Sequence, residues 1–189
     1  MELVLIRHPR PAAAEGLCYG SSDLDADSAA LAQCAAAVRD QLGALQPAAG
    51  TLWFSSPLLR CMRLADMLAP GCSRDARIAE MDFGAWEGKP WPAIPRAEVD
   101  AWAADLLHYR PGGGESVAGV AQRVQSFLDG LRSASGERAV IICHAGTIRL
   151  ITALAGGQPL EQAALNAAAT PHSIAYGEVL LLPLRAKPV

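Results

Sequence analysis

Three short apolar runs, each followed at once by polar residues, constrain the fold of this chain most strongly. The runs cover residues 3–6, 51–55 and 139–143 and are rich in Val, Ile, Leu or aromatic side chains. Such runs are typical of strands that are covered on both faces. Apolar residues recur at helical spacing over residues 31–45 and 117–131, which predicts two amphipathic helices between the strands. We therefore expect an α/β fold with a parallel-rich sheet.

The length and apolar content predict one domain over residues 1–189. The chain has 189 residues, of which 51% are hydrophobic, enough for a single sizeable core. Residues 82–114 are punctuated by Gly and Pro and are predicted to form a loop-rich and helical insertion that covers the active site. Its tryptophans either line a ligand mouth or pack the insertion onto the domain; they are Trp86, Trp91 and Trp102. The tail over residues 172–184 predicts a late strand at a sheet edge.

Charge and cysteine content exclude several classes of function. The net charge is -3 and no block of Lys or Arg is present, so binding to nucleic acid or to an anionic membrane is not expected. The apolar run at the N-terminus is too short for a signal or a membrane span, which favours the cytoplasm. Five cysteines without a Cys-x-x-Cys pair predict neither disulfides nor a zinc site. A metal site built on His8, His144 and His172 also lacks the usual spacing, so we expect no metal.

The residues with chemical potential follow directly after the three apolar runs. Arg7 and His8 follow the first run, Arg60 lies shortly after the second, and His144 follows the third. Right-handed crossovers bring the carboxyl ends of parallel strands to one edge of the sheet, where open α/β sheets bind ligands. Two arginines and two histidines are therefore expected to converge there.

The second junction predicts the start of a helix that faces this edge. Ser56 is expected to be the N-cap and Pro57 the first helical residue, which puts Arg60 in the first turn. Helical side chains lean toward the N-terminus, so Arg60 is expected to point back at the strand ends. Exposed amides of that turn add partial positive charge. The combined pocket suits a dianion.

Four motifs together resemble those of the histidine phosphatase superfamily, which has the phosphoglycerate mutase-like fold. The family's opening strand ends in Arg-His-Gly, and later motifs read Ser-Ser-Pro-Leu-x-Arg, Glu-x-x-x-Gly-x-x-Glu-Gly and His-x-Gly. The corresponding segments here are residues 7–9, 55–60, 80–88 and 144–146. The resemblance extends from residue 3 to about residue 182. It implies a three-layer α/β/α sandwich around a mixed, mostly parallel sheet.

The resemblance also implies catalytic roles. His8 would be the nucleophile that becomes phosphorylated, while Arg7, Arg60 and His144 would bind the phosphate oxygens without a metal ion or cofactor. Glu80 would serve as general acid and then as base, so the implied catalytic set is His8, Glu80 and His144. Glu87 and Glu115 are rivals for the role of acid. Glu115 also belongs to a Gly-Glu-Ser segment like that of the family, which makes it a candidate secondary substrate-binding residue.

Two departures from the family pattern refine the assignment. The usual glycine after the histidine is Pro9, whose carbonyl can still accept a hydrogen bond from one ring nitrogen of His8. The asparagine that often binds phosphate six positions after the histidine is Ala14. The motif Arg-His-x-Arg-Pro and residues 16–23 resemble the α-ribazole phosphatase branch, linked to cobalamin biosynthesis. Residues 16–23 form either an ordinary surface turn or a substrate-binding turn with candidates Tyr19, Gly20 and Ser21.

The expected activity is hydrolysis of a small phosphate ester, with α-ribazole 5′-phosphate as substrate. A phosphoglycerate mutase-like activity, a broad-specificity phosphatase and a protein phosphohistidine phosphatase are alternatives within the superfamily. A non-catalytic phospholigand sensor is the alternative from another class, although a sensor has no need of a nucleophile and a proton donor. The chain is expected to be a monomer or a homodimer.

Overall fold

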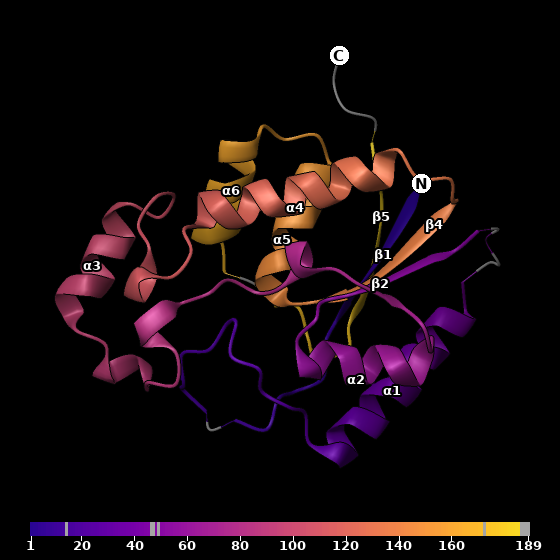
Figure 1. The fold of residues 1–189 in the computed structure, drawn as a ribbon, viewed down its shortest axis with the longest axis horizontal. Coiled ribbons are helices and arrows are strands. Elements are labelled where there is room, and N and C mark those ends of the chain that lie inside the picture. The colour runs from indigo at the N-terminus through magenta and orange to yellow at the C-terminus, as the bar shows by residue number, and fades with distance from the viewer. Residues whose placement is uncertain (14, 46–47, 49, 172, 186–189) are drawn as a thin grey trace.

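The computed structural model describes residues 1–13, 15–45, 48, 50–171 and 173–185, and its centre is a five-stranded sheet (Figure 1). The strands are β1 (Glu2–Arg7), β2 (Leu52–Ser55), β3 (Ser73–Arg74), β4 (Arg138–Cys143) and β5 (Val179–Pro183). They lie in the order β3-β2-β4-β1-β5. Strand β5 is antiparallel to β1, and every other pairing is parallel. The predicted mixed, mostly parallel sheet is therefore confirmed.

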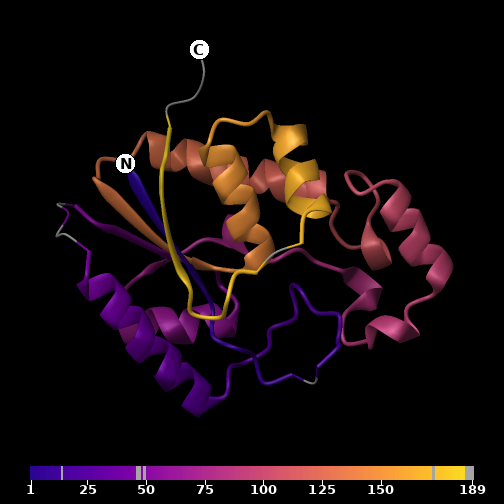
Figure 2. The ribbon, with the colours of Figure 1, turned by 180° about the vertical axis from the view of Figure 1, so that it is seen from behind.

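Helices cover both faces of the sheet, because successive strand residues point to opposite sides. In β1, Leu3 and Leu5 pack in a cluster with α4 (Val117–Arg132), α5 (Ala145–Ala155) and α6 (Leu160–Ala169). Val4 and Ile6 pack in a second cluster with α1 (Ser28–Gly43) and α2 (Leu59–Leu68). Seen from behind, these two groups of helices lie on either side of the strands (Figure 2). This is the predicted three-layer α/β/α sandwich.

The predicted strands and helices agree with the structure, apart from the start of the second helix and the end of the first. The three apolar runs form β1, β2 and β4, and the late edge strand is β5. The two amphipathic patterns correspond to α1 and α4, although α1 ends at Gly43 and so does not include Leu45. Strand β3 was not expected, because it has only two residues and both are exposed. Two positions that entered the sequence argument, Ala14 and His172, lie outside the described residues.

The predicted start of the second helix is wrong. Helix α2 begins at Leu59, and its N-cap is Leu58, which makes no side-chain cap. Ser56 does accept a weak hydrogen bond from the Leu58 amide, at 3.3 Å, but its hydroxyl also contacts His144. The cap at Leu59 comes instead from Asp23, whose carboxylate accepts from the Leu59 amide at 2.7 Å. Arg60 remains in the first turn because the shift is short.

Residues 82–114 extend the molecule at one end of the sandwich (Figure 1). They contain the helix α3 (Arg96–Ala104) and the short 3₁₀ turns η2 (Gly84–Trp86), η3 (Trp91–Ala93) and η4 (Pro111–Gly113). Gly84 and Gly112 both have positive φ, and a Cβ at Gly84 would lie 2.4 Å from the Gly112 carbonyl oxygen. Only glycine allows these two turns to meet. Among the described helices, none is long and apolar enough to cross a membrane.

Candidate active site

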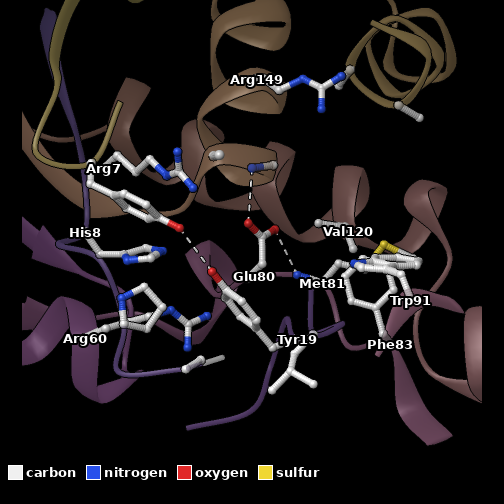
Figure 3. Close-up of a pocket in the computed structure, with 18 of the residues that line it drawn as sticks. Arg7, His8, Tyr19, Arg60, Glu80, Met81, Phe83, Trp91, Val120 and Arg149 are labelled. Carbon is white, nitrogen blue, oxygen red and sulfur yellow. Dashed lines mark hydrogen bonds between the residues drawn. The ribbon is translucent and has the colours of Figure 1, made fainter. Parts of the chain in front are cut away.

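A pocket of about 530 Å³ opens at the carboxyl ends of the parallel strands. Its walls have two different characters (Figure 3). Arg7, His8 and Arg60 lie on one side, and an apolar wall that includes Phe83 and Trp91 lies on the other, with Glu80 between them. The convergence of strand ends expected from the sequence thus produces a polar end and an apolar end of one pocket.

His8 follows β1 directly, and its ring is held in one orientation. Its Nδ1 lies 2.6 Å from the carbonyl oxygen of Pro9, so we assign the ring proton to Nδ1. Burial and the positive charge of Arg60, with a smaller contribution from Arg7, lower the pKa of His8 from 6.5 to about 3, although the hydrogen bond to Pro9 opposes this. The imidazole is therefore neutral near pH 7 and carries its free electron pair on Nε2.

Two guanidinium groups flank His8. Arg60 is fully buried and donates to the carbonyl oxygens of Ser22 and Gly20, at 2.8 and 2.6 Å. Arg7 donates to the Ile174 carbonyl at 2.5 Å, and its guanidinium carbon lies 3.9 Å from the ring centre of Tyr176. Neutral partners fix both groups, and none of the ion pairs found among the described residues involves either arginine. Their positive charge stays available for an anion.

His144 lies behind His8 and is fully buried. The two ring centres are 5.0 Å apart, and His144 Nε2 lies 2.8 Å from the Ser56 hydroxyl oxygen. Burial, followed by the charges around it, lowers the pKa of His144 well below its usual value. Arg7 and Arg60 belong to the pocket wall of the described structure, whereas His144 does not. The structure thus brings His144 to the site but behind its surface.

Glu80 lies in the pocket wall, between its two ends (Figure 3). Its carboxylate accepts hydrogen bonds from the amides of Met81 and Gly146, both at 3.1 Å. Gly146 belongs to the first turn of α5, and a Cβ there would lie 2.6 Å from the Glu80 carboxylate. The glycine of the His-x-Gly motif therefore makes room for this carboxyl group, and two amides fix its orientation.

The two rival carboxylates lie away from the pocket surface. Glu87 binds the backbone and hydroxyl groups of Ser21 and Ser22. Glu115 makes a two-point ion pair with Arg123, with both N–O distances 2.9 Å. Neither residue is found in the pocket wall of the described structure. Their contacts are with the protein itself, so neither position fits a proton donor to substrate.

The candidate substrate-binding turn is divided in the same way. Tyr19 lies in the pocket wall, and its hydroxyl is 3.2 Å from that of Tyr176. Gly20 and Ser21 do not belong to the pocket wall formed by the described residues. The Gly20 carbonyl faces Arg60, and so this turn presents an acceptor to the arginine instead of an amide to phosphate.

The apolar end of the pocket is built from two segments. Phe83, Trp91 and Trp102 come from the 82–114 segment, and Leu17 comes from the loop after β1. The rings of Trp91 and Trp102 are nearly parallel, with an angle of 9° and centres 6.3 Å apart. Trp86 is buried instead and donates to Glu98 at 2.6 Å. Two of the three tryptophans thus line the pocket, and the third packs the segment.

Sequence reasoning missed three residues of the site. Ser56 was interpreted as a helix cap, but it contacts His144. Tyr176 lies in the segment before β5, where no motif marks it. Its ring faces the Arg7 guanidinium and is tilted by 50° against the ring of His8. Arg149 lies in the pocket wall above Glu80 (Figure 3), and its position one turn after Gly146 on α5 was the available signal. No group of His, Cys, Asp and Glu suited to a metal ion occurs within the described ranges.

Comparisons with known proteins agree with this geometry. Residues 3–176 match the histidine phosphatase superfamily (branch 1). A curated relative named "Putative phosphoserine phosphatase 2", from Hydrogenobacter thermophilus, is 32% identical over 115 residues, which are 57% of this chain and 57% of the relative. The chain therefore matches little more than half of that protein's length.

Solved structures extend the similarity over nearly the whole chain. A mycobacterial glucosyl-3-phosphoglycerate phosphatase in complex with VO3 is 26% identical, with a TM-score of 0.77 over 95% of this chain and 91% of that one. The α-ribazole phosphatase from Shigella flexneri is 24% identical, with a TM-score of 0.79 over 96% of this chain and 89% of that one. The second similarity concerns the fold alone.

Proposed function

Since the chain belongs to the histidine phosphatase superfamily, we propose that it hydrolyses a phosphomonoester through a covalent intermediate on His8 and without a metal ion. The observation that carries this proposal is the state of His8. A buried, neutral imidazole with its free electron pair on Nε2 lies between two guanidinium groups. This combination provides a nucleophile and the positive charge that attracts its target.

The first half-reaction transfers the phosphoryl group to His8. Nε2 of His8 attacks phosphorus, the bond from phosphorus to the ester oxygen breaks, and Glu80 in its protonated form gives a proton to the leaving oxygen. Arg7 and Arg60 stabilise charge on the phosphate oxygens. Each keeps a buried Nε–H without a partner in the described structure, which favours an entering anion.

The second half-reaction restores the enzyme. Glu80 is now a carboxylate and takes a proton from water, the water oxygen attacks phosphorus, and the bond between phosphorus and His8 Nε2 breaks. Inorganic phosphate leaves and His8 is neutral again. For His144, which lies outside the pocket wall of the described structure, we propose a supporting role from behind His8, since the two ring centres are 5.0 Å apart.

For the substrate we propose α-ribazole 5′-phosphate, and thus a role in cobalamin biosynthesis. The apolar wall with its two parallel tryptophans suits a leaving group that contains a flat aromatic ring. The sequence of residues 16–23, which resembles that of the α-ribazole phosphatase branch, brings Tyr19 to the same pocket. Residues 82–114 would then act as a cover over the site of one catalytic domain, working in the cytoplasm.

Phosphoserine is the second candidate, favoured by the relative from Hydrogenobacter thermophilus. Phosphoserine is small and polar, and Arg149 provides a cation for its carboxylate, whereas the tryptophans would stay unused. The two candidates predict different orders of kcat/KM. We expect a higher kcat/KM for α-ribazole 5′-phosphate than for O-phosphoserine, 3-phosphoglycerate or phosphohistidine peptides.

A substrate panel with the full chain, run before and after exhaustive chelation, tests the proposal. Hydrolysis that persists without metal ions fits a site where arginines supply the charge. A preference for O-phosphoserine would replace the substrate and leave the mechanism intact. Isomerisation of 3-phosphoglycerate would indicate a mutase, and tight phosphate binding without any turnover would indicate a sensor.

A further inference from the structure

Arg60 obtains its orientation from a backbone turn and not from a carboxylate. Its guanidinium donates to the carbonyl oxygens of Gly20 and Ser22, at 2.6 and 2.8 Å. The side chain is fully buried. An arginine side chain has many rotamers, so hydrogen bonds are needed to hold it in one of them. The direction of Arg60 is therefore only as well defined as the position of these two carbonyl groups.

Glu87 binds the other side of the same turn. One carboxylate oxygen accepts from the Ser21 amide at 2.8 Å and from the Ser21 hydroxyl at 2.9 Å. The other accepts from the Ser22 amide at 2.6 Å and from the Ser22 hydroxyl. A fifth bond, 3.0 Å long, comes from the Phe83 amide. Burial raises the pKa of Glu87, but these hydrogen bonds outweigh it and hold the pKa below its usual value.

One peptide unit joins the two charged groups. The Gly20 carbonyl and the Ser21 amide belong to the same planar trans peptide, so they point in opposite directions. The amide faces Glu87 and the carbonyl faces Arg60. The negative charge therefore aligns the peptide dipole so that its carbonyl end meets the positive charge, and neighbouring hydrogen bonds of this kind strengthen one another.

Glycine at position 20 is what allows this arrangement. A Cβ at Gly20 would lie 1.8 Å from the Met81 carbonyl oxygen and 2.7 Å from the Phe83 ring. The turn is thus pressed against the segment that follows Glu80. A direct ion pair between Glu87 and Arg60 would neutralise the guanidinium, whereas contact through a peptide unit leaves its remaining N–H groups for phosphate.

We propose that Glu87 is a positioning residue for Arg60, acting through the Gly20–Ser21 peptide unit to set the phosphate-binding direction of the guanidinium. This inference rests on the proposed function, because it concerns the phosphate end of that site. It assigns to the second glutamate of the 80–88 motif a role distinct from proton transfer. In Glu87→Gln, the amide nitrogen would face donors of Ser21 or Ser22, so the turn would lose part of its support.

The test is a double-mutant cycle with vanadate as the probe of phosphate binding. Wild type, Glu87→Gln, Arg60→Ala and the double variant are compared by the vanadate inhibition constant against p-nitrophenyl phosphate. We expect Glu87→Gln to weaken vanadate inhibition by roughly 10-fold, the lower end of what changes in supporting residues cause. In the Arg60→Ala background the same change should have almost no further effect. A purely structural role predicts that both losses add.

Two further variants keep the outcome interpretable. Glu98→Gln is the matched control, because Glu98 also lies in the 82–114 segment but binds Trp86. It should leave vanadate inhibition unchanged. If Glu87→Gln does not fold, the variant with both Ser21→Ala and Ser22→Ala removes two of the five bonds to Glu87, together with the Ser21 hydroxyl bond to Asp82. It should show a smaller, equally non-additive loss.

The results separate this inference from the proposed function. Additive effects, unchanged vanadate inhibition in Glu87→Gln, or an equal loss in Glu98→Gln would overturn the role of Glu87 while wild-type turnover remained. A wild-type protein that hydrolyses no phosphomonoester would instead overturn the proposed function. Vanadate binding by calorimetry would then still test the coupling of Glu87 to Arg60.

Discussion

The two ends of the pocket differ in how they are built. The proposed phosphate end consists of residues at the end of β1 and the start of α2. His8 and Arg60 are buried, Arg7 is half-buried, and all three are held by backbone carbonyls. The proposed leaving-group end consists of aromatic side chains from the 82–114 segment, of which Trp91 is 38% exposed. Rigid core elements thus carry the groups for chemistry, and a surface segment carries those for recognition.

This difference separates reaction type from substrate choice. Changes at the phosphate end should lower turnover of every ester, because the transferring group is common to all of them. Changes at the aromatic end should alter the ranking of esters and leave small substrates unaffected. Each prediction below would weaken or sharpen that division.

Among changes that keep the proposed nucleophile His8, the largest effect is expected for Arg60→Ala. Loss of one preorganised donor to a developing oxyanion costs about 10²- to 10³-fold in kcat, and the loss should be equal for p-nitrophenyl phosphate and alkyl phosphates. Arg63→Ala is the control, because Arg63 lies on the same helix but pairs with Asp25 at the surface. Steady-state kinetics of both variants provide the comparison. A loss of kcat confined to one class of leaving group would mean that Arg60 acts on the leaving group and not on the transferring phosphate.

Glu80→Gln should affect alkyl esters most. Because an alkoxide needs a proton and p-nitrophenolate hardly does, we expect a loss of roughly 10²-fold for alkyl phosphates and a much smaller one for p-nitrophenyl phosphate. The ratio of the two kcat values is the measurement. If both substrates slowed equally, Glu80 would not be the proton donor.

The buried histidine should make folding stability depend on pH. In the unfolded chain His8 takes up a proton below pH 6.5, whereas in the folded protein it does so only near pH 3. The unfolded state therefore binds more protons in this window, and stability falls as the pH falls. Between pH 7.5 and 5.0 the His8 contribution is a loss of about 2 kcal/mol. Urea unfolding at the two pH values measures the drop in the free energy of unfolding. This drop should be about 2 kcal/mol smaller in His8→Ala than in wild type. An equal drop in both proteins would contradict a buried, neutral His8.

The smallest effect is expected at the aromatic end. Trp91→Ala should lower kcat/KM for α-ribazole 5′-phosphate by about 10-fold, since an aromatic contact of this kind contributes about 1 kcal/mol beyond the buried area. O-phosphoserine turnover should stay constant. Trp91→Phe, which keeps a flat ring, should recover most of the loss. Equal losses for both esters would mean that Trp91 supports the fold and not the choice of substrate.

The convergence of the residues at the polar end of the pocket could be predicted because these residues follow a regular rule. Parallel strands end at one edge, so Arg7, His8 and Arg60 were predicted to converge from their positions after apolar runs, and the structure brings them together. The proposed role of Glu80 rests on the family motif, because spacing alone does not bring a loop carboxylate to the N-terminus of α5.

Other features could not be predicted because they depend on contacts between distant residues. Ser56 has the sequence context of a helix cap, yet the hydroxyl of a buried serine beside a buried histidine forms the stronger bond. Tyr176 reaches Arg7 across 169 positions of the chain, through the antiparallel return to β5. From its motif position Glu87 is a rival for the role of acid, but in the structure its carboxylate accepts five hydrogen bonds from the protein.

The most direct test of the account is chemical identification of the intermediate. Rapid-quench labelling with a ³²P-labelled ester should trap phosphate on the wild-type protein, and the label should be lost in acid but survive in base, as a phosphoramidate does. His8→Ala should show neither label nor turnover, a loss of at least roughly 10⁴-fold. An acid-stable label, or a label that persists in His8→Ala, would contradict nucleophilic attack by His8.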